Sequence, residues 1–411
     1  MIFKKLSEVA DIFLSSVDKK INEKEKSVKL CNFIDVYYNF DLDNNDSKKF
    51  MIVTANDNEI DKFQLLKDDV VITKDSETRD DIGISCHIRD NFDDMVLLGY
   101  HCALIRPKNN IVGAYLNGCL KSKMSRTYFS NQASGSGQRY TLTEKGIGEV
   151  KIPYFEKEIQ EKIACLISNI NQKIRINNRI NDNLQQLLSD TFSYWFKQFQ
   201  FPNKDGKAYN SNNGQMKWSD ELKTHIPYNW EVRSLKDILI KNSKSAVSIK
   251  SNVDTIDLSV MPSDSLSLNL VNNSSNFTTN LFEMNEGDLL FGSIRPYLHK
   301  AGIAPVNGYV AGTVHSYSVI RDYDYNLALS ILTSKDLFNY AVKVSIGTKM
   351  PIVSSDNLLN FKFAYSEDIA KLLSNLDIKS KIISNIQENI KLQQLRDYLL
   401  PLLMNGQISI E

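Results

Sequence analysis

The chain has 411 residues, 42% of them hydrophobic, which is enough for two or three domains with cores of their own. Lysine plus arginine and aspartate plus glutamate each number 49, which excludes a global field that would attract nucleic acid or an anionic membrane. No run of about 18 apolar residues occurs and the start lacks the apolar segment of a signal peptide, so we expect a cytoplasmic protein without membrane spans.

Residues 1–153 are predicted to form a first mixed α and β domain. The predicted strands are short runs of apolar and β-branched residues at 51–55, 69–73, 95–107 and 139–143. Residues 111–129 predict a helix despite two glycines. The glycine-serine loop at 131–143, NQASGSGQRYTLT, enters the last strand. Ordering such a flexible loop costs entropy, so we expect it to approach a ligand or another backbone closely.

The segment from Ile159 to Phe199 contains neither proline nor glycine and predicts one long helix, which with its flanks makes a spacer at 154–201. Its apolar residues lie three and four positions apart, so they form a stripe that needs a helical partner. In a heptad assignment one position comprises Ile163, Ile170, Asn177 and Leu184, and the other comprises Leu166, Lys173, Ile180 and Leu187. The polar members would set register and partner.

The second half of the chain is predicted to repeat this order. Residues 202–229 are polar and turn-rich and predict a connector, 230–364 predict a second mixed domain, and 365–411 predict a second long helix with a tail. The second helix repeats the LQQL motif of the first, at 392–395 as at 184–187. Its leucines at comparable positions are Leu373, Leu376, Leu392 and Leu395.

Matched landmarks in both halves predict an internal duplication. The matched pairs are LSEVADI at 6–12 with LKDILI at 235–240, KDDVV at 67–71 with EGDLL at 286–290, ALIRP at 103–107 with SVIRD at 318–322, and GSGQRYTL at 135–142 with SIGTKMPI at 345–352. Gly83 follows Asp69 by 14 residues, as Gly302 follows Asp288. The predicted fold is therefore α+β, with two similar mixed domains separated by two long helices.

The two helices would relate the domains by a pseudo-twofold axis if they pack as an antiparallel coiled coil. A helix of about 41 residues is roughly 60 Å long. That length exceeds one turn of DNA, about 34 Å. Such helices would act as a ruler between the two domains.

Sequence motifs of common enzymes are missing. The chain has no Pro-Pro dipeptide, which the catalytic segment of an adenine amino-methyltransferase contains, and no Walker loop for phosphates. Its five histidines include no pair spaced for a metal on one helix face, and its five cysteines include no CxxC pair. We therefore predict reduced, mostly buried thiols, no metal site and no catalytic site.

The order and wording of these landmarks resemble the specificity subunit of Type I restriction-modification systems. The segments that carry the resemblance are EGDLLFGSIRPYLHKAGIAP, the GSGQ and GTK loops, the connector GQMKWSDELKTHIPYNWEVRSLKDI and the terminal LQQLRDYLLPLLMNGQI. The resemblance covers nearly the full chain. One departure is the bare start MIFKKL, which lacks the IPYNW lead-in of the second domain.

The resemblance implies a non-catalytic chain that binds double-stranded DNA. Each domain would be a target recognition domain for one half of a bipartite, asymmetric site, and the helices would set the gap and dock two methyltransferase subunits. The resemblance also implies motor-nuclease subunits where cleavage occurs. It places S-adenosylmethionine, and ATP and Mg for cleavage, on the partner subunits. The methylated base would be an adenine, flipped out of the duplex.

Candidate DNA contacts are cationic and hydrogen-bonding side chains in matched loops of both domains. In the first domain they are Lys74, Thr78, Arg79, Ser134, Ser136, Gln138 and Arg139. In the second they are Ser293, Arg295, Tyr297, His299, Lys300, Thr348 and Lys349. The loops differ between domains, which matches an asymmetric target.

One alternative stays open from the sequence. A coiled-coil scaffold with two protein-binding heads would also explain the long helices and the balanced charge. Such a scaffold would show no salt-sensitive affinity for DNA.

Overall fold

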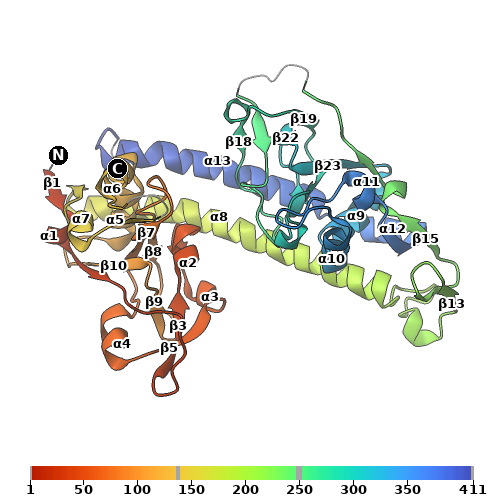
Figure 1. Cartoon of the computed structure of the whole chain (residues 1–411), viewed down its shortest axis with the longest axis horizontal. Coiled ribbons are helices and arrows are strands. Elements are labelled where there is room, and N and C mark those ends of the chain that lie inside the picture. The colour runs from red at the N-terminus through yellow and green to blue at the C-terminus, as the bar shows by residue number, and fades with distance from the viewer. Residues whose placement is uncertain (1, 136–138, 247–251, 409–411) are drawn as a thin grey trace. The chain divides into compact units, whose positions relative to one another are not determined.

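The computed structural model describes residues 2–135, 139–246 and 252–408. The chain divides into two compact units: unit 1 comprises Met1–Lys173 and Leu392–Glu411, and unit 2 comprises Ile174–Lys391. Two long helices, α8 (Lys157–Phe192) and α13 (Lys379–Met404), each contribute to both units (Figure 1). The structure therefore has the mixed α and β composition and the long helices expected from the sequence.

Unit 1 is built around a five-stranded sheet in the order β2-β10-β6-β8-β4, next to a three-stranded sheet in the order β5-β3-β9. The strands of these sheets are β2 (Ala10–Leu14), β3 (Lys26–Cys31), β4 (Asp41–Leu42), β5 (Met51–Ala55), β6 (Val70–Thr73), β8 (Ser85–Ile88), β9 (Val96–Leu98) and β10 (Cys102–Pro107). Two short pairs complete the unit: β1 (Ile2–Lys5) with β12 (Lys151–Tyr154), and β7 (Asp75–Ser76) with β11 (Tyr140–Thr141). Its helices are α1 (Leu6–Val9), α2 (Phe33–Tyr37), α3 (Asn44–Ser47), α4 (Asp57–Phe63), α5 (Gly113–Lys121), α6 (Lys123–Gln132) and α7 (Glu144–Gly148).

Unit 2 contains two four-stranded sheets, in the orders β16-β23-β20-β21 and β18-β17-β22-β19. Their strands are β16 (Leu239–Lys241), β17 (Asp254–Ile256), β18 (Asn272–Asn273), β19 (Leu281–Met284), β20 (Leu289–Gly292), β21 (Ala301–Ile303), β22 (Gly308–Ala311) and β23 (Val314–Val319). A pair joins β15 (Glu231–Ser234) to β24 (Lys362–Tyr365), and the connector forms a hairpin of β13 (Met216–Ser219) and β14 (Thr224–Pro227). The helices are α9 (Tyr325–Leu332), α10 (Lys335–Val344), α11 (Ser355–Leu359) and α12 (Glu367–Ser374). The 3-10 turns used below are η3 (Leu235–Asp237) and η5 (Pro296–Leu298).

The two units share a topology, which agrees with the internal repeat inferred from the sequence. In each, an antiparallel pair (β1 with β12, or β15 with β24) is followed by a sheet with the same strand sequence, β2-β10-β6-β8 or β16-β23-β20-β21. Asp69 and Asp288 mark the same turn, because each carboxylate accepts the backbone N–H three residues earlier, at 2.8 and 2.7 Å. The match between KDDVV and EGDLL is thereby confirmed.

Two other sequence matches are wrong in register. Val70 pairs with Ile105 across β6 and β10, and its counterpart Leu289 pairs with Tyr317, so Arg106 corresponds to Ser318 and not to Arg321. Gly83 lies before β8 with φ of 71°, whereas Gly302 lies within β21. Spacing along the chain gave the wrong correspondence because the loops between the matched strands differ in length. The pairing of the strands sets the correct register.

Several predicted elements are divided in the structure. The helix expected at 111–129 is two helices, because the Ser122 hydroxyl caps α6 by accepting from the Ser125 N–H. The strand expected at 95–107 is β9 and β10, separated by a turn. The C-terminal helix breaks between α12 and α13, where the Asn326 amide donates to the carbonyls of Leu373 and Leu376 at 3.0 and 2.8 Å.

The long central helix is confirmed as α8, and it continues as a π-helical turn over Ser193–Lys197. The first predicted heptad position is correct in that Ile163, Ile170 and Asn177 are buried. The second is one residue off, since Ile167, Ile174, Asn181 and Leu188 are buried while Lys173, Ile180 and Leu187 are exposed. One residue turns a helix by about 100°, which moves the expected stripe away from the packed face.

Buried asparagines join α8 to α13 within unit 2. Asn177 donates to Asn389 Oδ1 at 2.9 Å, and Asn385 donates to Asn181 Oδ1 at 2.8 Å. Because the residue number rises along α8 as it falls along α13, the two helices run antiparallel here. Asn389 also donates to Asn269 Oδ1 at 3.0 Å, so a loop of the sheet-rich part is tied to the same contact.

We expect Asn389→Ala to lower the free energy of unfolding by about 1–3 kcal/mol, because it removes the hydrogen bonds that Asn389 forms with Asn177 and Asn178 of α8 and with Asn269. The measurement is denaturant unfolding of the full chain, with Ser384→Ala, an exposed change on the same helix, as the control. Equal stability of the two variants would contradict a structural role for the asparagine contact.

Candidate nucleic-acid interface

In unit 1 the loop that follows β6 is joined to the loop that precedes α7. Tyr140 pairs with Ser76 and Thr141 with Asp75 in the β7–β11 pair, and a further bridge joins Ser134 to Thr141. These pairings place the side chains of both predicted loops on one surface. Two of the predicted loop residues, Ser136 and Gln138, lie outside the described residues. Arg139 is exposed.

Asp75 is the centre of this loop pair. Its buried carboxylate accepts from Thr141 Oγ1 at 2.7 Å and from His101 Nδ1 at 2.9 Å, and it lies 3.3 Å from Arg139 and 3.4 Å from Lys74. Burial raises the pKa of the Asp75 carboxyl, but the hydrogen bonds from His101 and Thr141 and the charges of Lys74 and Arg139 hold that pKa below its usual value. A charged Asp75 therefore ties both loops together.

The predicted DNA contacts of unit 1 fall into two groups. The Lys74 side chain is buried, with its ammonium 4.4 Å from the centre of the Tyr100 ring. Thr78 and Arg79 are exposed, and the Arg79 guanidinium lies 5.2 Å from the Tyr140 ring. Ser134 is also exposed. Thr78, Arg79 and Ser134 are therefore accessible for contact, whereas Lys74 is buried under the loop pair.

Unit 2 contains the corresponding loop pair. Ile294 bridges Ile352, which in turn bridges Ile346, and the Arg295 N–H donates to the Pro351 carbonyl at 2.7 Å. The backbone equivalence is close, because the Val353 N–H donates to the Ser293 carbonyl as the Leu142 N–H donates to that of Lys74. The described residues on either side of GSGQ, and those on either side of GTK, are therefore paired in the same way next to the loop after the third strand of their sheet.

The predicted residues of unit 2 also divide by exposure. Arg295, Tyr297, Thr348 and Lys349 are exposed, whereas Ser293 is buried and donates to the Thr313 carbonyl at 2.9 Å. His299 Nδ1 lies 2.9 Å from the Asp264 carboxylate, and its ring stacks on Phe338 with 4.5 Å between centres. Lys300 donates to the Leu258 carbonyl at 2.6 Å, and partial burial lowers the pKa of its ammonium.

Sequence reasoning missed the groups that hold or extend these surfaces. Asp75, His101 and Tyr140 organise the first loop pair, and the apolar side chains of Ile346, Met350 and Ile352 are exposed on the second. The only signal for Asp75 was its place directly after a buried strand. An aspartate next to a predicted DNA contact does not itself suggest DNA binding, because it repels phosphate.

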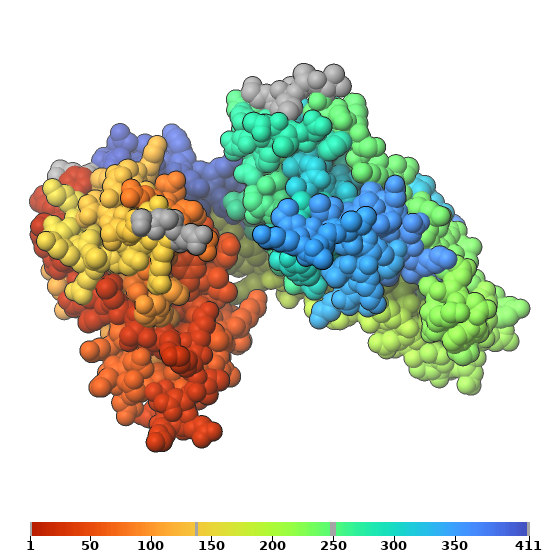
Figure 2. Space-filling view, viewed as in Figure 1, coloured from red at the N-terminus to blue at the C-terminus, as the bar shows by residue number. Residues whose placement is uncertain are grey.

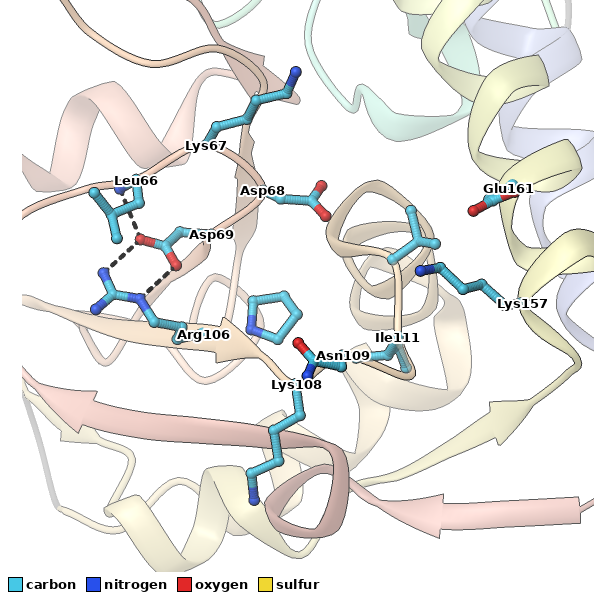
Figure 3. Close-up of a pocket in the computed structure, with 12 residues that line it drawn as sticks. Leu66, Lys67, Asp68, Asp69, Arg106, Lys108, Asn109, Ile111, Lys157 and Glu161 are labelled. Carbon is cyan, nitrogen blue, oxygen red and sulfur yellow. Dashed lines mark hydrogen bonds and ion pairs between the residues drawn. The ribbon is translucent and has the colours of Figure 1, made fainter.

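A cavity of about 430 Å³ lies in unit 1 where α8 begins (Figure 3). Asp68 lies on one side of it, and Lys157 and Glu161 of α8 lie on the other. Nearby, Arg106 binds Asp69 through two hydrogen bonds of 2.9 and 2.8 Å. The lining contains both positively and negatively charged side chains. Arg106 and Asp69 in this lining are already paired with each other.

The predicted docking leucines and isoleucines of the long helices are mostly packed inside their own unit. Ile163, Ile170, Asn177 and Leu373 are buried, and Leu184, Leu376 and Leu392 are half-buried. Leu187 and Leu395 are 48% and 46% exposed. Ile176, Ile180 and Leu187 of α8 and Tyr194 of the π-helical turn that continues it form an exposed series, spaced by four, seven and seven residues. They lie on one face of the helix.

Metal sites and membrane-spanning helices are two other features to consider among the described residues. No group of three or more histidine, cysteine, aspartate or glutamate side chains in this part of the chain is arranged to hold a metal ion. None of the helices in the same residues is long and apolar enough to cross a membrane. Four of the five cysteines are buried, and Cys165 is exposed.

Comparisons with known proteins find similar ones in Type I restriction-modification systems. The model of the Type I restriction modification DNA specificity domain matches residues 1–186. The specificity subunit of the Type I restriction enzyme MjaIX from Methanocaldococcus jannaschii is 26% identical over 325 residues, which cover 75% of this chain and 72% of that protein. The chain is thus similar to specificity subunits of Type I restriction-modification systems, and its first 186 residues match their DNA specificity domain.

Other similar proteins match a smaller part of the chain or are more distant in sequence. The HindI specificity subunit from Haemophilus influenzae is 31% identical over 112 residues, which cover 27% of this chain and 24% of the relative. Solved structures include an S subunit from M. genitalium (12% identity, TM-score 0.49, 98% and 96% of the two chains covered). Another is the HsdS subunit from Thermoanaerobacter tengcongensis (12% identity, TM-score 0.33, 99% and 97% covered). Specificity subunits are the non-catalytic members of such systems, so no catalytic site is assigned to this chain.

We expect Asp75→Asn to destabilise unit 1 at neutral pH, because the neutral amide loses the charge that binds His101, Lys74 and Arg139. The folded pKa of the Asp75 carboxyl lies below its usual value, so its stabilisation is present above the unfolded pKa and is lost as the pH falls through the folded pKa. The measurement is thermal unfolding between neutral and acid pH, with the exposed Asp61→Asn as control. A difference between the two variants that stays constant down to the lowest pH would refute this role.

Proposed function

We propose that this specificity subunit binds double-stranded DNA and that each unit reads one half of a bipartite, asymmetric site. The observation that best supports this proposal is that the same loop pair recurs in both units with different exposed side chains. Unit 1 presents Thr78, Arg79, Ser134 and Arg139, and unit 2 presents Arg295, Tyr297, Thr348 and Lys349. Hydroxyl and guanidinium groups are suited to phosphates and base edges.

The candidate contacts divide into buried residues that support the loops and exposed residues that are available to contact DNA. Lys74 and Ser293 are the residues at which the two loops of a pair join, and both are buried. We assign them a supporting role. His299 and Lys300 are partly buried and hold the second loop through Asp264 and the Leu258 carbonyl. The exposed residues, with Ser136 and Gln138 as sequence candidates, are proposed to contact DNA.

Balanced charge is compatible with this function because the cations are local. Phosphate contacts need only a few lysines and arginines on the DNA-facing surface, and each released counterion makes binding weaker as salt rises. A coiled-coil scaffold with two protein-binding heads would lack this salt dependence. The similarity to specificity subunits and the repeated loop pair favour DNA.

The long helices are proposed to set the gap between half-sites and to dock two methyltransferase subunits. Most of the predicted docking residues pack within this chain, so the exposed series Ile176, Ile180, Leu187 and Tyr194 is the better candidate surface. Heptad-like spacing on an exposed face suits contact with another helix. The methyl donor S-adenosylmethionine, and ATP and Mg for cleavage by motor-nuclease subunits, would bind those partners.

A methylation map tests the DNA-reading function. The chain is expressed with its methyltransferase in a host without adenine methylation, and modified bases are sequenced with and without the chain. We expect a split motif with one methylated adenine in each half, which disappears without the specificity subunit. Methylation that is unchanged by omitting this chain would refute the proposal.

Arg79→Gln and Arg295→Gln should each weaken binding to the mapped site by about five- to 150-fold, because each removes a contact worth roughly 1–3 kcal/mol. Each should alter a different half-site. Glutamine keeps a similar length, which limits the effect on the left-handed backbone of Arg295, whose φ is 52°. The measurement is a salt series of affinities for the assembled complex, with the exposed Lys62→Gln as a charge-matched control. Equal losses in all three variants would point to net charge alone.

Leu187→Lys should reduce co-purification of the methyltransferase, because it puts a charge in the proposed apolar contact. The exposed Asn183→Lys, on the same helix, adds the same charge outside the series and should leave assembly unchanged. The ratio of subunits in size-exclusion chromatography measures the result. Intact assembly of Leu187→Lys would remove this residue from the docking surface.

A further inference from the structure

The matched loop pairs differ systematically in chemistry. Counted from the paired strands and bridges, Asp75 corresponds to Ile294, Thr78 to Tyr297, Ser134 to Ile346 and Thr141 to Ile352. At every one of these four positions a small polar or charged side chain in unit 1 is replaced by an apolar or aromatic one in unit 2. At these four positions the same scaffold therefore carries polar or charged side chains in unit 1 and apolar or aromatic ones in unit 2.

The apolar side chains of unit 2 are exposed rather than packed. Ile346 is 76% exposed, Tyr297 51%, Met350 50% and Ile352 45%. Ile346 and Ile352 lie opposite each other across a β-bridge, so they form a broad face instead of one projecting side chain. An exposed apolar cluster of this kind usually marks a contact surface.

This face is held in place by the fold. The Arg295 N–H binds the Pro351 carbonyl, and Arg295 and His299 both have left-handed φ angles, of 52° and 51°. His299 stacks on Phe338 of α10, one of the helices that form part of the unit 2 surface in Figure 2. The backbone of η5, which carries Tyr297, is thus held at both ends.

Three cations lie in or next to the segments that carry the face. Arg295 and Lys349 lie in its two loops, and Lys343 lies in the last turn of α10. All three are exposed, and none forms an ion pair with a carboxylate in the described part of the chain. An apolar face with unpaired cations in its own loops fits a ligand that is apolar at the contact and negatively charged beside it.

We propose that unit 2 reads its half-site largely through apolar contact with thymine methyl groups in the major groove, whereas unit 1 reads through hydrogen bonds. The thymine C5-methyl is an apolar group on a base edge, and phosphates flank it on both strands. Any half-site methylated on adenine contains at least one thymine opposite it. This inference rests on the proposed DNA-reading function.

The test replaces thymine by deoxyuridine, which lacks only the methyl group. Arg295→Gln first identifies which half of the mapped site unit 2 reads. Affinities of the assembled complex are then measured for duplexes with single deoxyuridines in that half. We expect a loss of about fourfold for each contacted methyl.

The variant Ile346→Ser with Ile352→Thr installs the unit 1 residues and should abolish the sensitivity to deoxyuridine in that half-site only. Ile346→Val with Ile352→Val keeps an apolar face and should retain it. Thermal unfolding checks that both double variants fold. Comparing wild type and variant on the same two duplexes isolates the methyl contact from general effects on binding.

The possible failures are distinguishable. If specific binding is present but no deoxyuridine in that half-site changes affinity, or the polar double variant keeps the full sensitivity, the thymine contact is refuted while DNA reading stands. If the polar variant instead loses the methyltransferase, the face is a protein contact. If no specific binding or methylation depends on this chain, the proposed function itself fails.

Discussion

The buried amide contacts between α8 and α13 are the constraint on which unit 2 depends. Asn177 donates to Asn389 and Asn385 donates to Asn181, which fixes a single antiparallel register. Sliding one helix by a turn would leave amide groups buried without partners, at a cost of about 1–3 kcal/mol each. An entirely apolar interface would tolerate such a shift more easily.

Direct contacts connect this helix register to the loop proposed to contact DNA. Gln185 of α8 accepts from the Leu266 N–H at 3.1 Å and donates to the Asp264 carbonyl at 3.4 Å. The side chain of Asp264 then holds His299, which ends the η5 turn. The helix pair and the loop proposed to meet DNA are therefore linked by a short series of hydrogen bonds within one unit.

The repeat explains how one chain can present two surfaces. Strand order and the joining of the two loops are the same in both units, because they are set by backbone hydrogen bonds that accept many side chains. The loops carry the differences. Asp75 draws four polar partners together in unit 1, whereas Ile294 at the same place joins an apolar face in unit 2. Divergence at these positions leaves the cores intact, since the exposed side chains pack little.

Local patterns in the sequence determined the long helix, the position of strand β5 and the doubled order of elements. These depend on neighbours in the chain: the absence of proline and glycine from 159–199, and a β-branched run at Met51–Ala55. The family resemblance and the two loops proposed to contact DNA were also found from sequence, since their motifs are contiguous.

Only the tertiary structure decided which face of α8 is buried, where helices break, and how the two halves correspond residue by residue. Ile180 and Leu187 fit a heptad but point outward, because packing against α13 uses Ile174, Asn181 and Leu188. Arg106 matches Ser318 because strand pairing, and not spacing, sets the register. The burial of Lys74 beside Asp75 and the exposure of Ile346 likewise depend on contacts between residues far apart in the chain. Local sequence patterns contain no information on such contacts.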